Sequence, residues 1–120
     1  KYNLIISIGC PCLIKTNFEN YKKPIYNIHG GIIPFQIGRF SPLKSLQKDN
    51  KYLGSTIHII DNYFDSGKII SQDYFKIKNK EKIYNYNNVL KLSSELMSEF
   101  ISNKFKYIPN NILEDLRNNL

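Results

Sequence analysis

The chain contains short polar motifs whose side chains could perform chemistry together. Asn27 and His29 end an apolar run with one residue between them, so their side chains point to the same side of an extended strand. An amide and an imidazole placed in this way can both donate hydrogen bonds to one carbonyl oxygen and stabilise an oxyanion. Asp65, in a turn with Ser66 and Gly67, supplies a carboxylate that can hold an imidazolium or accept a proton from an attacking amine.

The residues around these motifs narrow the type of reaction. Gly30 and Gly31 follow His29 without side-chain bulk, which lets a substrate approach the backbone. No Ser or Cys lies in a nucleophile-elbow setting, which favours direct transfer to a bound nucleophile over a covalent acyl-enzyme. His58 shares a strand face with Thr56, so we interpret it as a supporting imidazole behind the site.

Cys10 and Cys12 are the two cysteines of the chain and are separated by one residue. That spacing is too tight for an ordinary disulfide and too short for the usual pair of zinc ligands, and the chain has no second pair. Because both follow an apolar run, we expect them to pack as small, reduced, hydrophobic side chains. Reduced thiols indicate a reducing compartment, and we expect the cytoplasm. No ligand spacing in the chain predicts a metal site.

The composition indicates one folded unit with excess positive charge. The 120 residues carry a formal net charge of +7 and are 42% hydrophobic, which excludes a chain disordered by composition. The lysines are scattered and only Arg39 and Arg117 are arginines, which favours a solvated surface over a nucleic-acid interface. No apolar run approaches the ~20 residues of a membrane span. The run from Leu4 to Ile8 is also too short for a secretory signal.

Apolar patterns predict alternating strands and helices. Leu4 to Ile8 is a continuous apolar run, as expected of a strand buried on both faces. Ser41 and Pro42 are typical of a helix N-cap and first turn, and predict a helix of about two turns. The same reasoning places further strands at 24–28, 55–61 and 68–77, and further helices at 11–18, 83–105 and 112–116.

This order of elements predicts an α/β fold. Strand-helix-strand units imply parallel pairing with right-handed crossovers. The few strands would leave exposed sheet edges, so we expect residues 1–120 to form the second half of a doubly wound, mostly parallel sheet within a longer protein. A chain of this kind is expected to aggregate, to associate as a homodimer or to unfold easily by itself.

In order and spacing, the motifs resemble the 10-formyltetrahydrofolate-dependent formyltransferase family, which includes glycinamide ribonucleotide, methionyl-tRNA and sugar-amine formyltransferases. That family's pattern runs Asn-x-His, a loop with Leu-Pro and then Gly, a helix, Gly-x-Thr-x-His, and Asp-x-Gly before an Ile-rich strand. This chain carries it as Asn27-Ile28-His29, Ile33-Pro34, Gly38, Gly54-Ser55-Thr56-Ile57-His58, Asp65-Ser66-Gly67 and Ile69-Ile70. The resemblance covers about 4–75 and implies part of a Rossmann-like catalytic domain whose N-terminal strands and Gly-rich loop are absent.

The resemblance also implies an activity and a set of roles. The activity is formyl transfer from 10-formyltetrahydrofolate to a small-molecule amine such as a sugar amine or glycinamide ribonucleotide, without a metal; a tRNA-borne amine stays open. The catalytic residues would be Asn27, His29 and Asp65, and the residues bordering the acceptor would be Gly30, Gly31 and Gly38. The residues bordering the folate would be Cys10, Cys12, Leu13, Ile14, Asp61, Asn62, Tyr63 and Phe64.

Two interpretations compete with a formyltransferase. One is a truncated or degenerate relative that binds folate or acts as an interaction module without activity. Retention of the amide, the imidazole and the carboxylate argues against it. The other is an RNA-binding module, which rests on charge alone and lacks clustered basic or aromatic positions.

Overall fold

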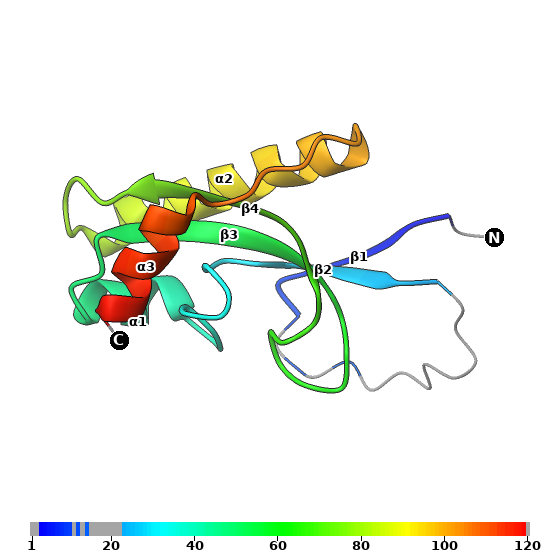
Figure 1. Ribbon diagram of the computed structural model, residues 1–120, viewed down its shortest axis with the longest axis horizontal. Coiled ribbons are helices and arrows are strands. Elements are labelled where there is room, and N and C mark those ends of the chain that lie inside the picture. Colours follow the sequence, from blue (N-terminus) through cyan, green and yellow to red (C-terminus); the bar gives the residue numbers. More distant parts are fainter. Residues whose placement is uncertain (1–2, 11, 13, 15–22, 120) are drawn as a thin grey trace.

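The computed structural model describes residues 3–10, 12, 14 and 23–119. It contains a four-stranded sheet and three helices, shown in Figure 1. The strands are β1 (Ile5–Ile8), β2 (Ile25–His29), β3 (Tyr52–Ile59) and β4 (Ile69–Lys76). The helices are α1 (Ser41–Gln47), α2 (Lys82–Ile101) and α3 (Asn110–Asn118). The helix expected at 11–18 lies largely outside the described residues.

The strands lie in the sheet in chain order, β1-β2-β3-β4, with mixed pairing. β1 and β2 are parallel, whereas β2–β3 and β3–β4 are antiparallel. The predicted α/β fold is confirmed, but the parallel pairing inferred from strand-helix-strand order is wrong for β2–β3 and β3–β4. The physical reason is that α1 does not carry the chain back across the sheet. It returns the chain at the same end, so β3 runs opposite to β2.

The helices cover both faces of the sheet (Figure 1). β3 is central, and six of its eight residues are buried because neighbouring strands and helices enclose it. Leu53 of β3 packs with Val89 of α2 on one face. On the other face, Tyr52 and Tyr74 lie against a cluster that includes Ile112 of α3. The amphipathic patterns at 83–105 and 112–116 thus correspond to helices, although α2 ends at Ile101.

β1 lies at an edge of the sheet rather than inside it. Its residues are half-buried or exposed, and Ile8 is 63% exposed. The expected burial of this strand on both faces is therefore not found among the described residues. An apolar run of this kind is compatible with an edge position when one face packs on the core, as Ile6 does against Ile28.

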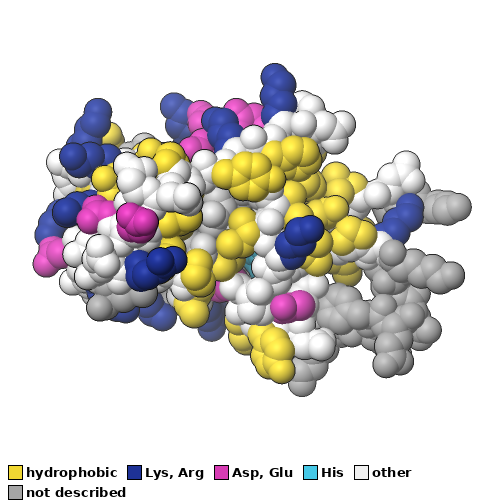
Figure 2. All heavy atoms as spheres, in the orientation of Figure 1, with side chains coloured by type: hydrophobic (Ala, Val, Ile, Leu, Met, Phe, Trp, Pro, Cys, Tyr) yellow, Lys and Arg dark blue, Asp and Glu magenta, His cyan; other side chains and the backbone are white. Residues whose placement is uncertain are grey.

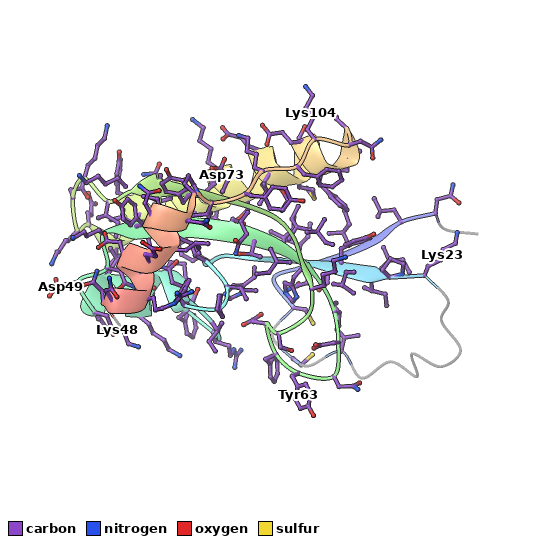
Figure 3. All side chains as sticks on the ribbon, viewed as in Figure 1. Lys23, Lys48, Asp49, Tyr63, Asp73 and Lys104 are labelled. Carbon is purple, nitrogen blue, oxygen red and sulfur yellow. The ribbon has the colours of Figure 1, made fainter. Side chains whose placement is uncertain are left out.

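The surface carries its positive charge in a dispersed way. Dark blue side chains lie over several parts of the visible face in Figure 2. Lys23, Lys48 and Lys104 project from three separate segments in Figure 3. The structure therefore shows no single basic face among the described lysines. No helix in the described ranges is both long and apolar enough to cross a membrane.

Candidate active site

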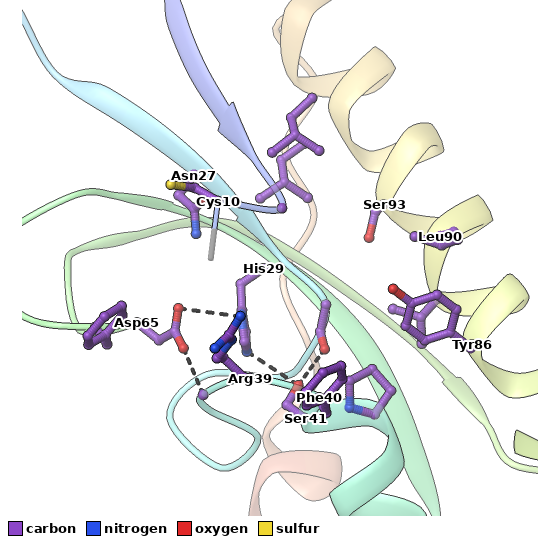
Figure 4. Close-up of a pocket in the computed structure, with 18 residues that line it drawn as sticks. Cys10, Asn27, His29, Arg39, Phe40, Ser41, Asp65, Tyr86, Leu90 and Ser93 are labelled. Atoms are coloured by element: carbon purple, nitrogen blue, oxygen red, sulfur yellow. Dashed lines mark hydrogen bonds and ion pairs between the residues drawn. The ribbon is translucent and has the colours of Figure 1, made fainter. Parts of the chain in front are cut away.

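A cavity of about 400 Å³ lies at the end of β2 that carries the Asn-x-His motif. Figure 4 shows its lining side chains. They come from the end of β1, from β2, from the loop before α1, from the turn at 64–65 and from α2. The pocket lining contains Asn27, His29 and Asp65. The three polar groups singled out by their types and spacing therefore meet in one cavity, although the first and last are 38 positions apart in the sequence.

The side chain of Asn27 is oriented by His58. These residues are paired across β2 and β3, and Nδ2 of Asn27 lies 3.1 Å from Nε2 of His58. Nδ1 of His58 lies 3.1 Å from the carbonyl oxygen of Ile59 and donates to it. The imidazole must therefore accept the Asn27 hydrogen bond through Nε2, which fixes its tautomer. Burial lowers the pKa of His58 below its ordinary value of 6.5, which favours this neutral form.

His29 is held between a backbone carbonyl and a carboxylate. Its Nε2 lies 2.6 Å from the carbonyl oxygen of Gln36 and donates to it. Its Nδ1 lies 3.4 Å from Oδ1 of Asp65, and the Oγ of Ser41 lies 3.4 Å from Nε2. Oxygen atoms that can accept a hydrogen bond therefore face both nitrogens of the His29 ring. Figure 4 shows the contacts of His29 with Asp65 and with Ser41 as dashed lines.

Asp65 connects the two loops that flank the pocket. Its Oδ2 accepts a hydrogen bond of 2.8 Å from the backbone N–H of Gly38, and its Oδ1 faces His29. The same Oδ1 lies 3.9 Å from Nε2 of His58. The side chain is 11% exposed, and its backbone is in the left-handed region with φ 49°. A non-glycine residue in that region costs about 1–2 kcal/mol, which the surrounding contacts must offset.

The Gly-x-Thr-x-His motif supports the site from behind. Oγ1 of Thr56 donates to the carbonyl oxygen of Gly31 at 2.7 Å and accepts from the N–H of Ile33 at 3.2 Å. These bonds hold the loop that follows β2. A Cβ on Gly54 would lie 2.4 Å from a backbone oxygen of β4 and 2.6 Å from the Ile32 side chain. Gly54, Thr56 and His58 therefore act through the loop and Asn27 and not by lining the cavity.

The three glycines expected to border the acceptor occupy different positions. Gly30 and Gly38 line the cavity, and Gly38 has φ 82°, which favours glycine. Gly31 is buried and does not line it, which differs from the expectation. A Cβ there would lie 2.3 Å from the carbonyl oxygen of Gln36 and 2.8 Å from Nε2 of His29. Gly31 instead allows that hydrogen bond to form behind the pocket.

The residues expected to border the folate are only partly gathered at the cavity. Cys10 and Phe64 line it. Asp61 shapes the β3–β4 loop, since its Oδ1 accepts from Ser66 Oγ at 2.6 Å, and this bond lowers the pKa of Asp61. Tyr63 lies at the tip of that loop and is 74% exposed (Figure 3). Those that do not line the cavity are Cys12, Ile14, Asp61, Asn62 and Tyr63, while Leu13 lies outside the described residues.

A second wall of the pocket was not predicted from the sequence. Its residues come from the segment before α1, from the first turn of α1 and from α2. They are Arg39, Phe40, Ser41, Pro42, Tyr86, Val89, Leu90 and Ser93. Phe40 is 65% exposed and has φ 57°, so a left-handed backbone holds its ring at the pocket. Tyr86 and Leu90 have the same helical spacing as core positions, so sequence periodicity alone could not assign them to a site.

No group of three or more His, Cys, Asp or Glu side chains suited to a metal ion occurs within 3–10, 12, 14 and 23–119. The histidines and Asp65 are instead engaged with the Asn27 amide, with backbone groups and with one another. The arrangement can donate hydrogen bonds to a carbonyl oxygen and accept a proton nearby.

Comparison with known proteins agrees with this chemistry. Residues 1–101 match the family model described as formyl transferase. The chain is 29% identical over 75 residues to formyltetrahydrofolate deformylase 2, mitochondrial, from Arabidopsis thaliana, a match that covers 62% of this chain and 23% of the relative. It is 29% identical over 103 residues to a methionyl-tRNA formyltransferase from Kosmotoga olearia, covering 84% of this chain and 33% of that protein.

The fold also matches solved structures. A sugar 3N-formyl transferase, determined in the presence of dTDP and 5-N-formyl-THF, superposes with a TM-score of 0.70 and 30% identity. That match covers 88% of this chain and 40% of the solved chain. The chain thus spans about a quarter to a third of the curated relatives and less than half of this structure. The family match, the shared fold and the convergent polar groups lead to one conclusion: the chain belongs to the formyl transferase family.

Proposed function

We propose that this protein transfers a formyl group from 10-formyltetrahydrofolate directly to an amine. The observation that carries the proposal is the convergence of Asn27, His29 and Asp65 on one cavity, with His58 fixing the orientation of the amide. The family match supports the folate donor. We further propose a small-molecule acceptor, such as a sugar amine or glycinamide ribonucleotide, and a location in the cytoplasm.

Asn27 is the main donor to the developing oxyanion in this mechanism. Its Nδ2 carries two hydrogens, of which His58 accepts one, so the second is available for the formyl oxygen. A donor fixed before the reaction needs no reorganisation when charge develops, and such donors typically contribute about 3–4 kcal/mol. The buried neutral imidazole of His58 therefore acts as a positioning group and not as a proton carrier.

His29 contributes a second donor and links the oxyanion to Asp65. Its Nε2–H is bonded to the carbonyl of Gln36, so donation to the formyl oxygen requires exchange of that bond. The amine attacks the formyl carbon, and its proton passes to Asp65 directly or through water. Collapse of the tetrahedral intermediate breaks the bond between carbon and folate nitrogen, and the proton is delivered to that nitrogen. The products are the formylated amine and tetrahydrofolate.

The test is a formyl-transfer assay on the full-length protein with 10-formyltetrahydrofolate and a panel of amines. Asn27→Ala should lower turnover by ~10²–10³, because it removes one preorganised oxyanion donor. Asn87→Ala, an exposed change on α2, is the matched control and should leave turnover unchanged. Turnover of Asn27→Ala within about threefold of the parent would remove Asn27 from the mechanism.

The same assay separates the proposed reaction from its alternatives. Formate released at an equal rate with and without any amine would indicate hydrolysis, with water as the acceptor. Folate binding without turnover, in the presence of every acceptor tested, would support the inactive binding module. Only amine-dependent production of a formamide supports the proposal.

A further inference from the structure

Cys10 and Cys12 form an exposed thiol pair just beyond the end of β1. Both side chains are exposed, and their sulfur atoms lie 3.7 Å apart. The Sγ of Cys10 also lies 3.3 Å from the carbonyl oxygen of Cys12 and donates to it. The expectation that these cysteines pack as hydrophobic side chains is therefore wrong. Both cysteines lie beyond the end of β1, the outer strand of the described sheet, and both are exposed even though an apolar run precedes them.

One residue separates the two cysteines, a spacing too tight for an ordinary disulfide, but their sulfurs already lie in van der Waals contact. A disulfide has an S–S length of about 2.0 Å, so the sulfurs need to approach by roughly 1.7 Å. The surroundings give room for this change. Gly9, the residue before Cys10, has no atom within 4 Å of the position of an added Cβ. Rotations of the two exposed side chains can supply part of this approach.

We propose that Cys10 and Cys12 are a redox modification site, at which a hydroperoxide converts the two thiols into a reversible intrachain disulfide. In the first step, one thiolate attacks the peroxide oxygen, the O–O bond breaks and the sulfur becomes a sulfenic acid with release of water or an alcohol. In the second step, the other sulfur attacks the sulfenic sulfur, the S–S bond forms and water leaves. The two sulfurs lose two electrons, which the peroxide accepts.

The electrostatic setting makes the pair act as a unit. The hydrogen bond with Cys10, and the charge that Cys10 would carry as a thiolate, raise the pKa of Cys12 above its ordinary value of 9.0. The guanidinium of Arg39 opposes this shift. When the Cys10 sulfur carries a negative charge, loss of the Cys12 proton is suppressed, so the reactive form of the pair is one thiolate beside one thiol. That is the arrangement a nucleophilic sulfur and a resolving sulfur require.

Because Cys10 lines the candidate active-site cavity, formation of the disulfide would change the shape of that cavity. Cys10 lines the same cavity as Asn27 and Phe64, and Figure 4 shows its sulfur within the set of pocket residues. A disulfide would change the position of the Cys10 sulfur and so reshape that wall. The proposal goes beyond the formyl-transfer function and does not rest on it, because the chemistry needs only the two thiols and an oxidant.

The experiment uses the fully reduced chain and hydrogen peroxide. The chain is treated with a small molar excess of peroxide, and the monomer is separated on a non-reducing gel. Its intact mass and its free thiols are then measured. We expect loss of both thiols, a mass lower by about 2 Da from removal of two hydrogens, and full recovery with dithiothreitol. The rate should rise with pH above neutrality, since the thiolate is the nucleophile.

Matched variants make the result specific. Cys10→Ser and Cys12→Ser change exposed side chains and each leave one thiol. The mass of each variant should increase by about 16 or 32 Da, because the single thiol gains one or two oxygen atoms instead of losing hydrogen. Dithiothreitol should not restore the free thiol fully in either variant. Oxygen addition to the parent at the same peroxide concentration, or disulfide-linked dimers as its main product, would overturn the proposal.

Discussion

Replacement of Gly31 by alanine should destabilise the protein far more than the same replacement at the neighbouring Gly30. The added methyl group at Gly31 would lie 2.3 Å from the carbonyl oxygen of Gln36, 2.6 Å from Oγ of Ser41 and 2.8 Å from Nε2 of His29. These distances are shorter than any that real Cβ atoms show, and one of the neighbours is a backbone atom. The loop must therefore move to accept the methyl group.

The magnitude follows from what that movement breaks. Overpacking of a buried site costs about 1–3 kcal/mol. The carbonyl of Gln36 also accepts the hydrogen bond from His29, whose loss adds about 1 kcal/mol. Gly31→Ala should therefore lower the free energy of unfolding by about 2–4 kcal/mol. At Gly30 the added methyl group meets only side chains, the nearest being Val89 at 3.1 Å, so the change should stay within about 1 kcal/mol in either direction.

The assay is urea unfolding followed by far-UV circular dichroism, because the chain contains no tryptophan to report by fluorescence. Measurement at two protein concentrations separates unfolding from self-association. The expected decrease in the free energy of unfolding should lower the midpoint of the urea transition for Gly31→Ala by about 1–2 M. Equal midpoints for the two alanine variants would show that the close approach behind the pocket does not constrain this glycine.

Three further predictions concern the pocket and the surface. Asp65→Asn should abolish formyl transfer across neutral pH while folding is retained, because the amide oxygen can still accept the Gly38 hydrogen bond; an unfolded variant would indicate a purely structural turn. The pKa of His58 is lowered in the folded state, so its contribution to stability is fully present above the unfolded pKa of 6.5 and should be lost as the pH falls below that value. In thermal melts, His58→Gln should reduce the fall of the melting temperature with decreasing pH. An equal fall in the variant and the parent would contradict a buried, neutral His58. Residues 1–120 alone should self-associate in light scattering through β1 and the exposed Ile83 and Leu90; a monodisperse monomer that melts above ~60 °C would refute this.

The sequence was sufficient to predict the types of the described strands and helices, and it singled out three polar side chains that line the pocket. Asn27 and His29 share a strand face because side chains alternate along a strand, and this alternation is a local property. The position of His58 directly opposite Asn27 is not local, because it depends on the antiparallel register of β2 and β3. Strand-helix-strand order does not fix that register or direction, so the pairing was predicted incorrectly.

The parts that sequence reasoning missed depend on how segments are arranged in space. Tyr86 and Leu90 belong to an apolar helix face, and nothing in their spacing distinguishes a pocket wall from a buried core. Gly31 was assigned to a substrate because glycine allows close approach, but the group that approaches it is the protein's own backbone. Cys10 and Cys12 were expected to be buried because they follow an apolar run, but that run ends at Ile8 and both thiols are exposed beyond it.

The hydrogen bond from Gly38 to Asp65 has a consequence for how the pocket opens. Ile37 and Arg39 on either side of Gly38 are exposed, so an amide in this loop would ordinarily exchange its hydrogen with water rapidly. The carboxylate 27 positions later protects this one amide and ties the loop before α1 to the loop between β3 and β4. This bond must break before either loop can move away from the other, so the exchange rate of a single backbone hydrogen reports how often the Asp65 carboxylate leaves its place.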